Sequence, residues 1–317
     1  MAGMDAPYHH WPKAELHLHL EGSIEPETLR ELAPDLTLDE IRAHYSYRDF
    51  AGFLGSFEWV TRHLQTPEHY ALITRRLLER LAGENVRYAE IIHSTGVVLW
   101  REQDPAAVYD AVRRAAERSG VEVQWIIDAV RQFGVEHVSQ VAEFAASRVN
   151  DGVVAFGIGG DEARGPARLF QETFRNARAQ GLRLTAHAGE TTGSASIWEA
   201  LEIGAERIGH GIHAIDDPVL VRHLRDRDIP LEVCLSSNVA TGAVASLREH
   251  PVRRLFNAGV PITLNTDDPA MFHTTLTAEY ELAARAFGFS EEELRGIAAN
   301  AFRYSFRKTE VEATARR

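Results

Sequence analysis

The stretch Ala14-Glu-Leu-His-Leu-His-Leu20 is typical of a short apolar strand, and it carries two histidines, His17 and His19, one residue apart. Residues i and i+2 of a strand share a face. The pair therefore aims two imidazoles at one point, as the first two ligands of a metal ion must be aimed. An isolated H-x-H pair is more often two structural histidines, so the metal interpretation depends on what the rest of the chain supplies.

Seven further strand-like segments follow, separated by sequence with helical periodicity. Most are near-continuous apolar runs, as expected of strands that are buried on both faces. We therefore expect an α/β fold, a single-domain (β/α)8 TIM-type barrel over residues 1–317, rather than an open doubly wound sheet. Extra helices between residues 24 and 81 are expected to cover its C-terminal mouth. The expected strands are 14–20, 86–93, 121–130, 153–159, 182–187, 207–211, 230–235 and 261–265.

The composition excludes several classes of partner. A formal net charge of −12 over 317 residues argues against a nucleic-acid surface or an anionic membrane face, because both need clustered Lys and Arg. We expect a small-molecule substrate and a monomer or homodimer. Cys234 is the single cysteine, which excludes an internal disulfide and fits a reducing cytoplasm. No signal peptide and no apolar run of membrane-spanning length is visible.

Residues suited to metal and proton chemistry lie where the expected strands end. His187 ends the fifth strand, His210 the sixth and Asp267 the eighth, as His17 and His19 end the first. In a (β/α)8 barrel these ends meet at one mouth, where active sites are built. Histidine nitrogens and a carboxylate suit Zn²⁺, which lowers the pKa of a bound water toward neutrality. Each residue alone also has a structural explanation, but five such placements together predict a metal site.

The other histidines do not share this placement. His93 ends the second strand and His213 lies close to His210, so both are expected to line the pocket at most. Eight more lie in the N-terminal arm or on expected helices, and we expect them to face solvent: His9, His10, His44, His63, His69, His137, His223 and His250.

Nearly the whole chain, from residue 12 to residue 300, resembles the adenosine deaminase family of the amidohydrolase superfamily. The other zinc deaminase pattern, H-x-E with P-C-x-x-C, is absent, which excludes the cytidine deaminase type. The resemblance is carried by six motifs in family order, His17-Leu-His19, Gly160-Asp-Glu162, His187-Ala-Gly-Glu190, Gly209-His-Gly211, Ser236-Ser237 and Thr266-Asp-Asp-Pro269.

The resemblance implies a role for each matching residue. Glu190 would protonate N1 of a purine while hydroxide attacks C6, and His210 would orient and help to deprotonate the attacking water. Asp268 would meet N7, and the backbone N–H of Gly160 would meet N3. The implied ligands of one Zn²⁺ per chain are His17, His19, His187 and Asp267, with His19 and Glu21 also facing the substrate.

The positions at which this sequence differs from the family pattern bear on which substrate the protein accepts. Glu21 stands where nucleoside-preferring members have Asp, at a position that faces the 5′ end of the ribose. Adenine deaminases of the family also have Glu there, but they usually continue after strand seven as C-P-x-S-N. Here residues 234–242 end in Thr-Gly, as in the nucleoside branch. The sequence leaves several substrates possible: adenosine, 2′-deoxyadenosine, free adenine, or a 5′-enlarged nucleoside such as the 6-aminodeoxyfutalosine of menaquinone biosynthesis.

Two other classes compete with a deaminase. Other amidohydrolases cut amides or phosphate esters with two metals bridged by a carboxylated lysine, but residues 159–161, at the end of strand four, contain no lysine. The second alternative is a non-catalytic purine-binding protein whose barrel has lost its enzymatic activity. Loss of Glu190, of His210 or of an implied metal ligand would indicate such a protein. All of these residues are present, which favours an enzyme.

Overall fold

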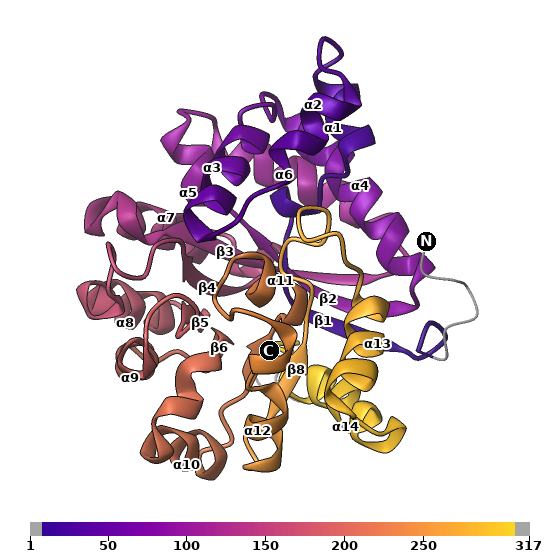
Figure 1. Ribbon diagram of the computed structural model, residues 1–317. Coiled ribbons are helices and arrows are strands. Elements are labelled where there is room, and N and C mark those ends of the chain that lie inside the picture. The colour runs from indigo at the N-terminus through magenta and orange to yellow at the C-terminus, as the bar shows by residue number, and fades with distance from the viewer. Residues whose placement is uncertain (1–7, 308–317) are drawn as a thin grey trace.

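The computed structural model describes residues 8–307 and shows eight parallel strands in chain order around a barrel (Figure 1). Each strand pairs with the next, and a bridge between Leu18 and Asp267 joins β1 to the segment after β8. The expected (β/α)8 barrel is confirmed. The strands are β1 Lys13–His19, β2 Val86–His93, β3 Glu122–Val130, β4 Val153–Gly159, β5 Arg183–Ala188, β6 Arg207–His210, β7 Leu231–Val233 and β8 Ile262–Leu264.

Helices surround the strands. The α-helices are α1 Pro26–Leu32, α2 Leu38–His44, α3 Phe50–Thr61, α4 Pro67–Gly83, α5 Thr95–Trp100, α6 Pro105–Ala116, α7 Val135–Ser147, α8 Gln171–Ala179, α9 Ser194–Glu202, α10 Pro218–Asp226, α11 Leu235–Ala240, α12 Val252–Asn257, α13 Leu276–Phe287 and α14 Glu291–Arg303. Short 3-10 turns are η1 Glu21–Ser23, η2 Arg131–Phe133, η3 Val149–Asp151, η4 Ala167–Phe170, η5 Ile212–Asp216 and η6 Leu247–Glu249.

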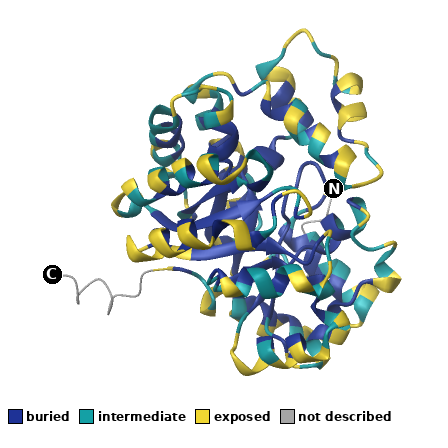
Figure 2. Ribbon diagram, turned by 90° about the vertical axis from the view of Figure 1, so that its left-hand side faces the viewer, coloured by how far each residue is buried: buried dark blue, intermediate teal, exposed yellow. Residues whose placement is uncertain are grey.

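Burial explains the near-continuous apolar character of the strands. Every residue of β1 and of β4 is buried, because the barrel interior lies on one side of each strand and helices on the other. Figure 2 shows the buried strands in the centre and the exposed outer faces of the helices around them. No helix within residues 8–307 combines the length and apolar character that crossing a bilayer requires.

Local sequence signals set several helix ends. Ser290 and Glu293 form a capping box at the start of α14, with each side chain accepting from the other residue's backbone N–H. Pro67 begins α4, where a missing N–H costs nothing. α14 packs on β1 and β8, and so supports the seam at which the barrel closes.

The extra helices between β1 and β2 divide into two groups. α3 places Phe53, Phe57 and Glu58 against the cavity at the barrel mouth, as expected of a cover. α4 instead packs on α6 and β2 at the side of the barrel. The expected strand 230–235 is shorter, since β7 ends at Val233 and α11 begins at Leu235. Cys234, expected within a strand, lies between them and is buried.

Candidate active site

The closure of the barrel brings the first and last motifs together. The backbone N–H of His19 donates to the carbonyl of Asp267 over 2.7 Å, and the N–H of Asp267 donates to the carbonyl of His17 over 3.1 Å. Asp267 and His210 have positive φ angles of 65° and 61°. Such backbone is costly for residues other than glycine and persists where surrounding contacts impose it, often at functional sites.

The predicted metal ligands converge within the barrel. His19 Nε2 lies 3.1 Å from His187 Nε2, and both His17 Nε2 and His19 Nε2 lie 3.4 Å from Asp267 Oδ1. Two overlapping groups with metal-binding spacing result, one of His17, His187, His210 and Asp267 and one of His19, Asp267 and Asp268. The structure therefore brings all the predicted ligands and His210 together around Asp267.

Neighbouring groups hold two of these imidazoles in fixed orientations. His17 Nδ1 lies 2.7 Å from Glu232 Oε2, and His187 Nδ1 lies 3.1 Å from the carbonyl of Ile158. Each Nδ1–H is thereby engaged, and Nε2 is left as the free donor atom, the arrangement usual behind metal-bound histidines. His17 Nε2 is buried without a hydrogen-bond partner. An orphaned nitrogen that faces a carboxylate and other imidazoles fits a metal ion.

The pKa values of three of the histidines and of Asp267 agree with this donor set, whereas for His17 the carboxylates of Asp267 and Glu232 outweigh burial and raise the pKa to about 10. Burial, reinforced by the neighbouring histidines, lowers the pKa of His187 well below its ordinary value. Burial likewise lowers the pKa of His19 to about 3 and that of His210 to about 4. Neutral imidazole is the form that binds metal. Burial alone would raise the pKa of Asp267, but the imidazole of His17, 3.4 Å away, and the adjacent imidazoles hold it well below the ordinary value.

Glu232, which sequence analysis did not identify, belongs to a buried ionic network behind His17. Its Oε1 accepts from Arg207 Nε over 2.6 Å, and the Arg207 guanidinium also lies 2.6 Å from Glu90 Oε2. Burying charges is expensive unless each is paired. The network therefore fixes Glu232 as a carboxylate and, through it, the orientation of His17.

Glu190 has the properties of a buried acid. Burial, together with the charge of Asp267, raises its pKa well above the ordinary range. Its carboxyl lies 3.6 Å from His210 Nε2. Glu162 of the Gly-Asp-Glu motif holds the turn in place by accepting from the backbone N–H groups of Gly189, Glu190 and Thr191 over 2.8–3.0 Å.

Asp268 faces the same cavity, and Gly22 makes room for it. A Cβ on Gly22 would lie 1.7 Å from Asp268 Oδ1, so only glycine fits beside this side chain. Asp268 Oδ1 is buried without a partner, and burial next to Asp267 raises the pKa of Asp268 well above the ordinary range. Glu21 is also buried and accepts from the backbone N–H of Ser94 over 3.1 Å.

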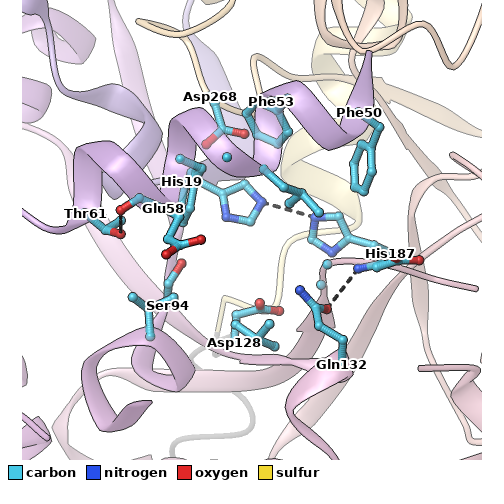
Figure 3. Close-up of a pocket in the computed structure, with 18 of the residues that line it drawn as sticks. His19, Phe50, Phe53, Glu58, Thr61, Ser94, Asp128, Gln132, His187 and Asp268 are labelled. Atoms are coloured by element: carbon cyan, nitrogen blue, oxygen red, sulfur yellow. Dashed lines mark hydrogen bonds between the residues drawn. The ribbon is translucent and has the colours of Figure 1, made fainter. Parts of the chain in front are cut away.

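The cavity that these residues enclose has a volume of about 510 Å³. That size lies within the range of roughly 300–1,000 Å³ typical of small-molecule sites. Figure 3 shows His19 and His187 side by side, with Asp268 above them and Asp128, Ser94 and Gln132 across the open space. The cavity also reaches the aromatic rings of Phe50, Phe53, Phe57, Trp100 and Phe133.

A chain of hydrogen bonds that the sequence did not predict fixes the tautomer of His210. The backbone N–H of Val252 donates to His250 Nδ1, so the hydrogen of neutral His250 is on Nε2, which lies 3.1 Å from Asn238 Oδ1. The Asn238 amide then donates to His210 Nδ1 over 3.1 Å. Neutral His210 consequently carries its hydrogen on Nε2, which faces the cavity. The backbone N–H of Val252 can only donate, so it determines the direction of every hydrogen bond in this series.

The expectation that His250 faces solvent is therefore wrong: it is buried. The helix pattern placed it outside the barrel, whereas it lies behind His210. The other seven histidines of that group are at least partly exposed. His93 is buried beside Thr95, and His213 pairs with Asp216, so neither lines the cavity.

Comparisons with known proteins agree with this geometry. The family model for adenosine deaminase matches residues 12–315. The chain is 40% identical over 306 residues to an adenine deaminase of Rhizobium leguminosarum bv. trifolii, covering 94% of this chain and 95% of that one. It is also 40% identical over 309 residues to an aminodeoxyfutalosine deaminase of Streptomyces avermitilis, covering 93% and 86%.

A solved structure shares the whole fold. The crystal structure of an amidohydrolase from Burkhoderia ambifaria with bound Zn superposes with a TM-score of 0.89 at 28% identity, covering 98% of this chain and 89% of that one. The chain therefore belongs to the adenosine deaminase family of the amidohydrolase superfamily and is a hydrolytic deaminase.

Proposed function

We propose that the protein deaminates adenine-type nucleosides by hydrolysis at C6, which releases ammonia and leaves a 6-oxopurine. The single observation that carries this proposal is the order of polar groups around the barrel mouth. Glu190 follows β5, His210 ends β6, Asp268 follows β8 and Gly160 follows β4. The perimeter of a purine presents N1, C6, N7, N9 and N3 in the same rotational order.

This order assigns each purine atom to a partner. With N1 at Glu190, C6 faces His210 and the histidine cluster, N7 faces Asp268, and N3 faces the backbone of Gly160. N9 then points toward β1–β3. The flat heterocycle is thereby surrounded by the acid Glu190, by the carboxyl group of Asp268, which can accept or donate, and by the backbone N–H of Gly160. The attacked carbon lies next to the predicted metal site.

The residues that would hold the metal are His17, His19, His187 and Asp267, with one ion per chain. Zn²⁺ bound there would lower the pKa of a water and supply the nucleophile at neutral pH. The engaged Nδ1 atoms and the orphaned His17 Nε2 support this assignment, as does the zinc in the structurally similar amidohydrolase.

Glu190 gives the proton to N1, because burial and the charge of Asp267 raise its pKa well above the ordinary range and so favour the protonated carboxyl. His210 orients the attacking water through the hydrogen on Nε2. The direction of the Val252–His250–Asn238 chain supports this orienting role over proton abstraction by neutral His210. Asp268, with its own raised pKa, can share a proton with N7.

Two observations bear on the substrate. The cavity of about 510 Å³ extends from the histidine cluster to Trp100 and Phe133, beyond the space that a free base occupies. This favours a nucleoside, including one with an enlarged 5′ substituent such as 6-aminodeoxyfutalosine. Free adenine is the second candidate, because relatives at 40% identity include an adenine deaminase as well as an aminodeoxyfutalosine deaminase. We further propose a cytoplasmic location, which the single buried cysteine supports.

The test is ammonia release, followed together with loss of the adenine absorbance band, on protein of measured zinc content. Adenosine, 2′-deoxyadenosine, adenine and 6-aminodeoxyfutalosine are compared. Turnover of one of the nucleosides with kcat/KM above roughly 10⁴ M⁻¹s⁻¹ supports the proposal. Preference for adenine would replace it with the second candidate, and no turnover by the zinc-loaded protein would contradict both.

A further inference from the structure

One wall of the cavity contains a carboxylate to which no motif assigns a role. Asp128 lies on β3, is only 5% exposed and lines the cavity. In Figure 3 it lies across the open space from His19, near Ser94 and Gln132. Within residues 8–307 it has no ion-pair partner, although a buried carboxylate ordinarily needs one.

The neighbouring strand is shaped to admit this side chain. A Cβ on Gly157 would lie 3.0 Å from Asp128 Oδ1, and one on Gly159 would lie 3.1 Å from Oδ2. Both glycines are on β4, which pairs with β3 so that Asp128 is opposite Gly157. Two glycines therefore let the carboxylate lie against the strand. The Gly159 backbone donates one hydrogen bond to it, which leaves most of its acceptor capacity unused.

The orientation proposed for the purine places N9 on this side. With N1 at β5, N3 at β4 and N7 beyond β8, the substituent on N9 must point toward β1–β3. The polar groups there are Glu21 after β1, Ser94 after β2 and Asp128 on β3. Glu21 Oε2 is buried without a hydrogen-bond partner. Asp128 lines the cavity and faces this substituent, whereas Glu21 is buried behind Ser94.

The possible ligands differ in how many hydrogen-bond donors they present to this side of the cavity. Free adenine presents a single donor on this side, N9–H, whereas a ribose presents several hydroxyl groups. We propose that Asp128 is a specificity-determining residue that accepts a hydrogen bond from a ribose hydroxyl of the substrate. The inference rests on the proposed function and narrows its substrate to a nucleoside.

The experiment combines removal of the carboxylate with removal of each hydroxyl. kcat/KM is measured for zinc-loaded wild type, Asp128→Asn and Asp128→Ala on adenosine, 2′-deoxyadenosine, 3′-deoxyadenosine and adenine. Asp110→Asn makes the same change on the outer surface, where Asp110 pairs with Arg148, and serves as the control. Thermal unfolding verifies that the variants fold, and Asp128→Asn preserves the shape of the side chain.

We expect both Asp128 variants to lose roughly 10- to 100-fold on adenosine, as for a hydrogen bond to a charged group. The loss should be much smaller on the deoxynucleoside that lacks the contacted hydroxyl, and under threefold on adenine. The dissociation constants of inosine and hypoxanthine, measured by calorimetry, give a second readout: Asp128→Asn should weaken inosine alone.

Equal losses on all four substrates would overturn the inference, as would a loss confined to adenine, which would indicate a contact with N9–H. Unchanged activity of both variants on adenosine would also overturn it while leaving the proposed function intact. A wild-type enzyme that is inactive on every adenine compound would instead contradict the proposed function itself.

Discussion

Two walls of the cavity differ in how their polar groups are supported. The reaction wall consists of Glu190, His210 and Asp267. Each of these residues is held by a neighbour: Glu162 binds the backbone of Glu190, Asn238 binds His210, and Ser237 donates to Asp267 over 2.6 Å. Such support keeps reacting groups in place before the substrate arrives.

The N9 wall, which consists of Ser94 and Asp128 with Glu21 buried behind Ser94, is incompletely paired. Burial raises the pKa of Glu21 and that of Asp128 to about 7 each, and no cation is paired with either within residues 8–307. We therefore propose that the reacting groups are fixed in the folded protein, whereas the N9 wall is completed only by hydrogen-bond donors of the substrate.

Substitution of Glu190 is the largest expected effect and tests the reaction wall. Glu190→Gln should lower kcat by roughly 10²–10⁴-fold, the usual contribution of a general acid, because the amide cannot supply the proton. Zinc content, measured by mass spectrometry, should not change. Glu199→Gln, at a carboxylate paired with Arg168 on the surface, is the control. Near-normal turnover by Glu190→Gln would remove the acid from the mechanism.

Zinc affinity tests whether Glu232 orients His17 as a metal ligand. Glu232→Gln should weaken zinc binding roughly 10- to 100-fold, because the charge that orients His17 is lost. Competition with a chelator measures this, and chelation of the wild type should abolish activity until zinc is restored. Glu90→Gln breaks the same Arg207 network without touching His17, so it should reduce stability but not affinity. Equal affinities for both variants would contradict this role of Glu232.

The buried carboxyl group of Asp128 in the N9 wall should make the free energy of unfolding depend on pH. The pKa of Asp128 is about 7 in the folded protein and 3.8 ordinarily, so the folded state retains the proton more strongly. Its contribution to the unfolding free energy is complete below about pH 4 and is lost as pH rises to about 7, with a slope of at most about 1.4 kcal/mol per pH unit.

Urea unfolding of zinc-free wild type and Asp128→Asn between pH 4 and 8 measures this contribution as a difference. The variant has no carboxyl to titrate, so the wild type should lose stability relative to it as pH rises. A constant difference would show that Asp128 is not desolvated as the structure indicates.

The smallest expected effect lies away from both walls. Ser290→Ala removes the side chain that caps α14 and should cost about 1 kcal/mol of unfolding free energy. Because α14 supports the barrel from outside, kcat/KM should stay within experimental error of the wild type. Urea unfolding and steady-state kinetics on the same preparations measure both quantities. A loss of activity without a loss of stability would connect this helix to the site.

The meeting of three histidines and Asp267 could be predicted from the sequence because each of them lies at or near the end of a strand. His17, His187, His210 and Asp267 meet as expected, since strand order alone brings their positions to one mouth. The eight strands could be predicted for the same reason: burial on both faces makes them apolar throughout.

The supporting residues could not be predicted, because their contacts depend on packing between distant elements. Glu232 lies 215 residues from His17, and nothing local to β7 indicates that pair. His250 follows a polar stretch that indicates exposure, yet it is buried behind His210. Asp128 lies within an apolar strand without any motif. Its only local signal is the glycine pair on β4, which acquires meaning once β3 and β4 are paired.

A crystal structure of the zinc-loaded protein with inosine bound would show which wall of the cavity faces which edge of the purine. We expect C6 beside His210 and the zinc, N1 at Glu190, N7 at Asp268, and the ribose against Asp128. A purine whose N9 substituent points away from β1–β3, or whose N1 is far from Glu190, would contradict this expectation.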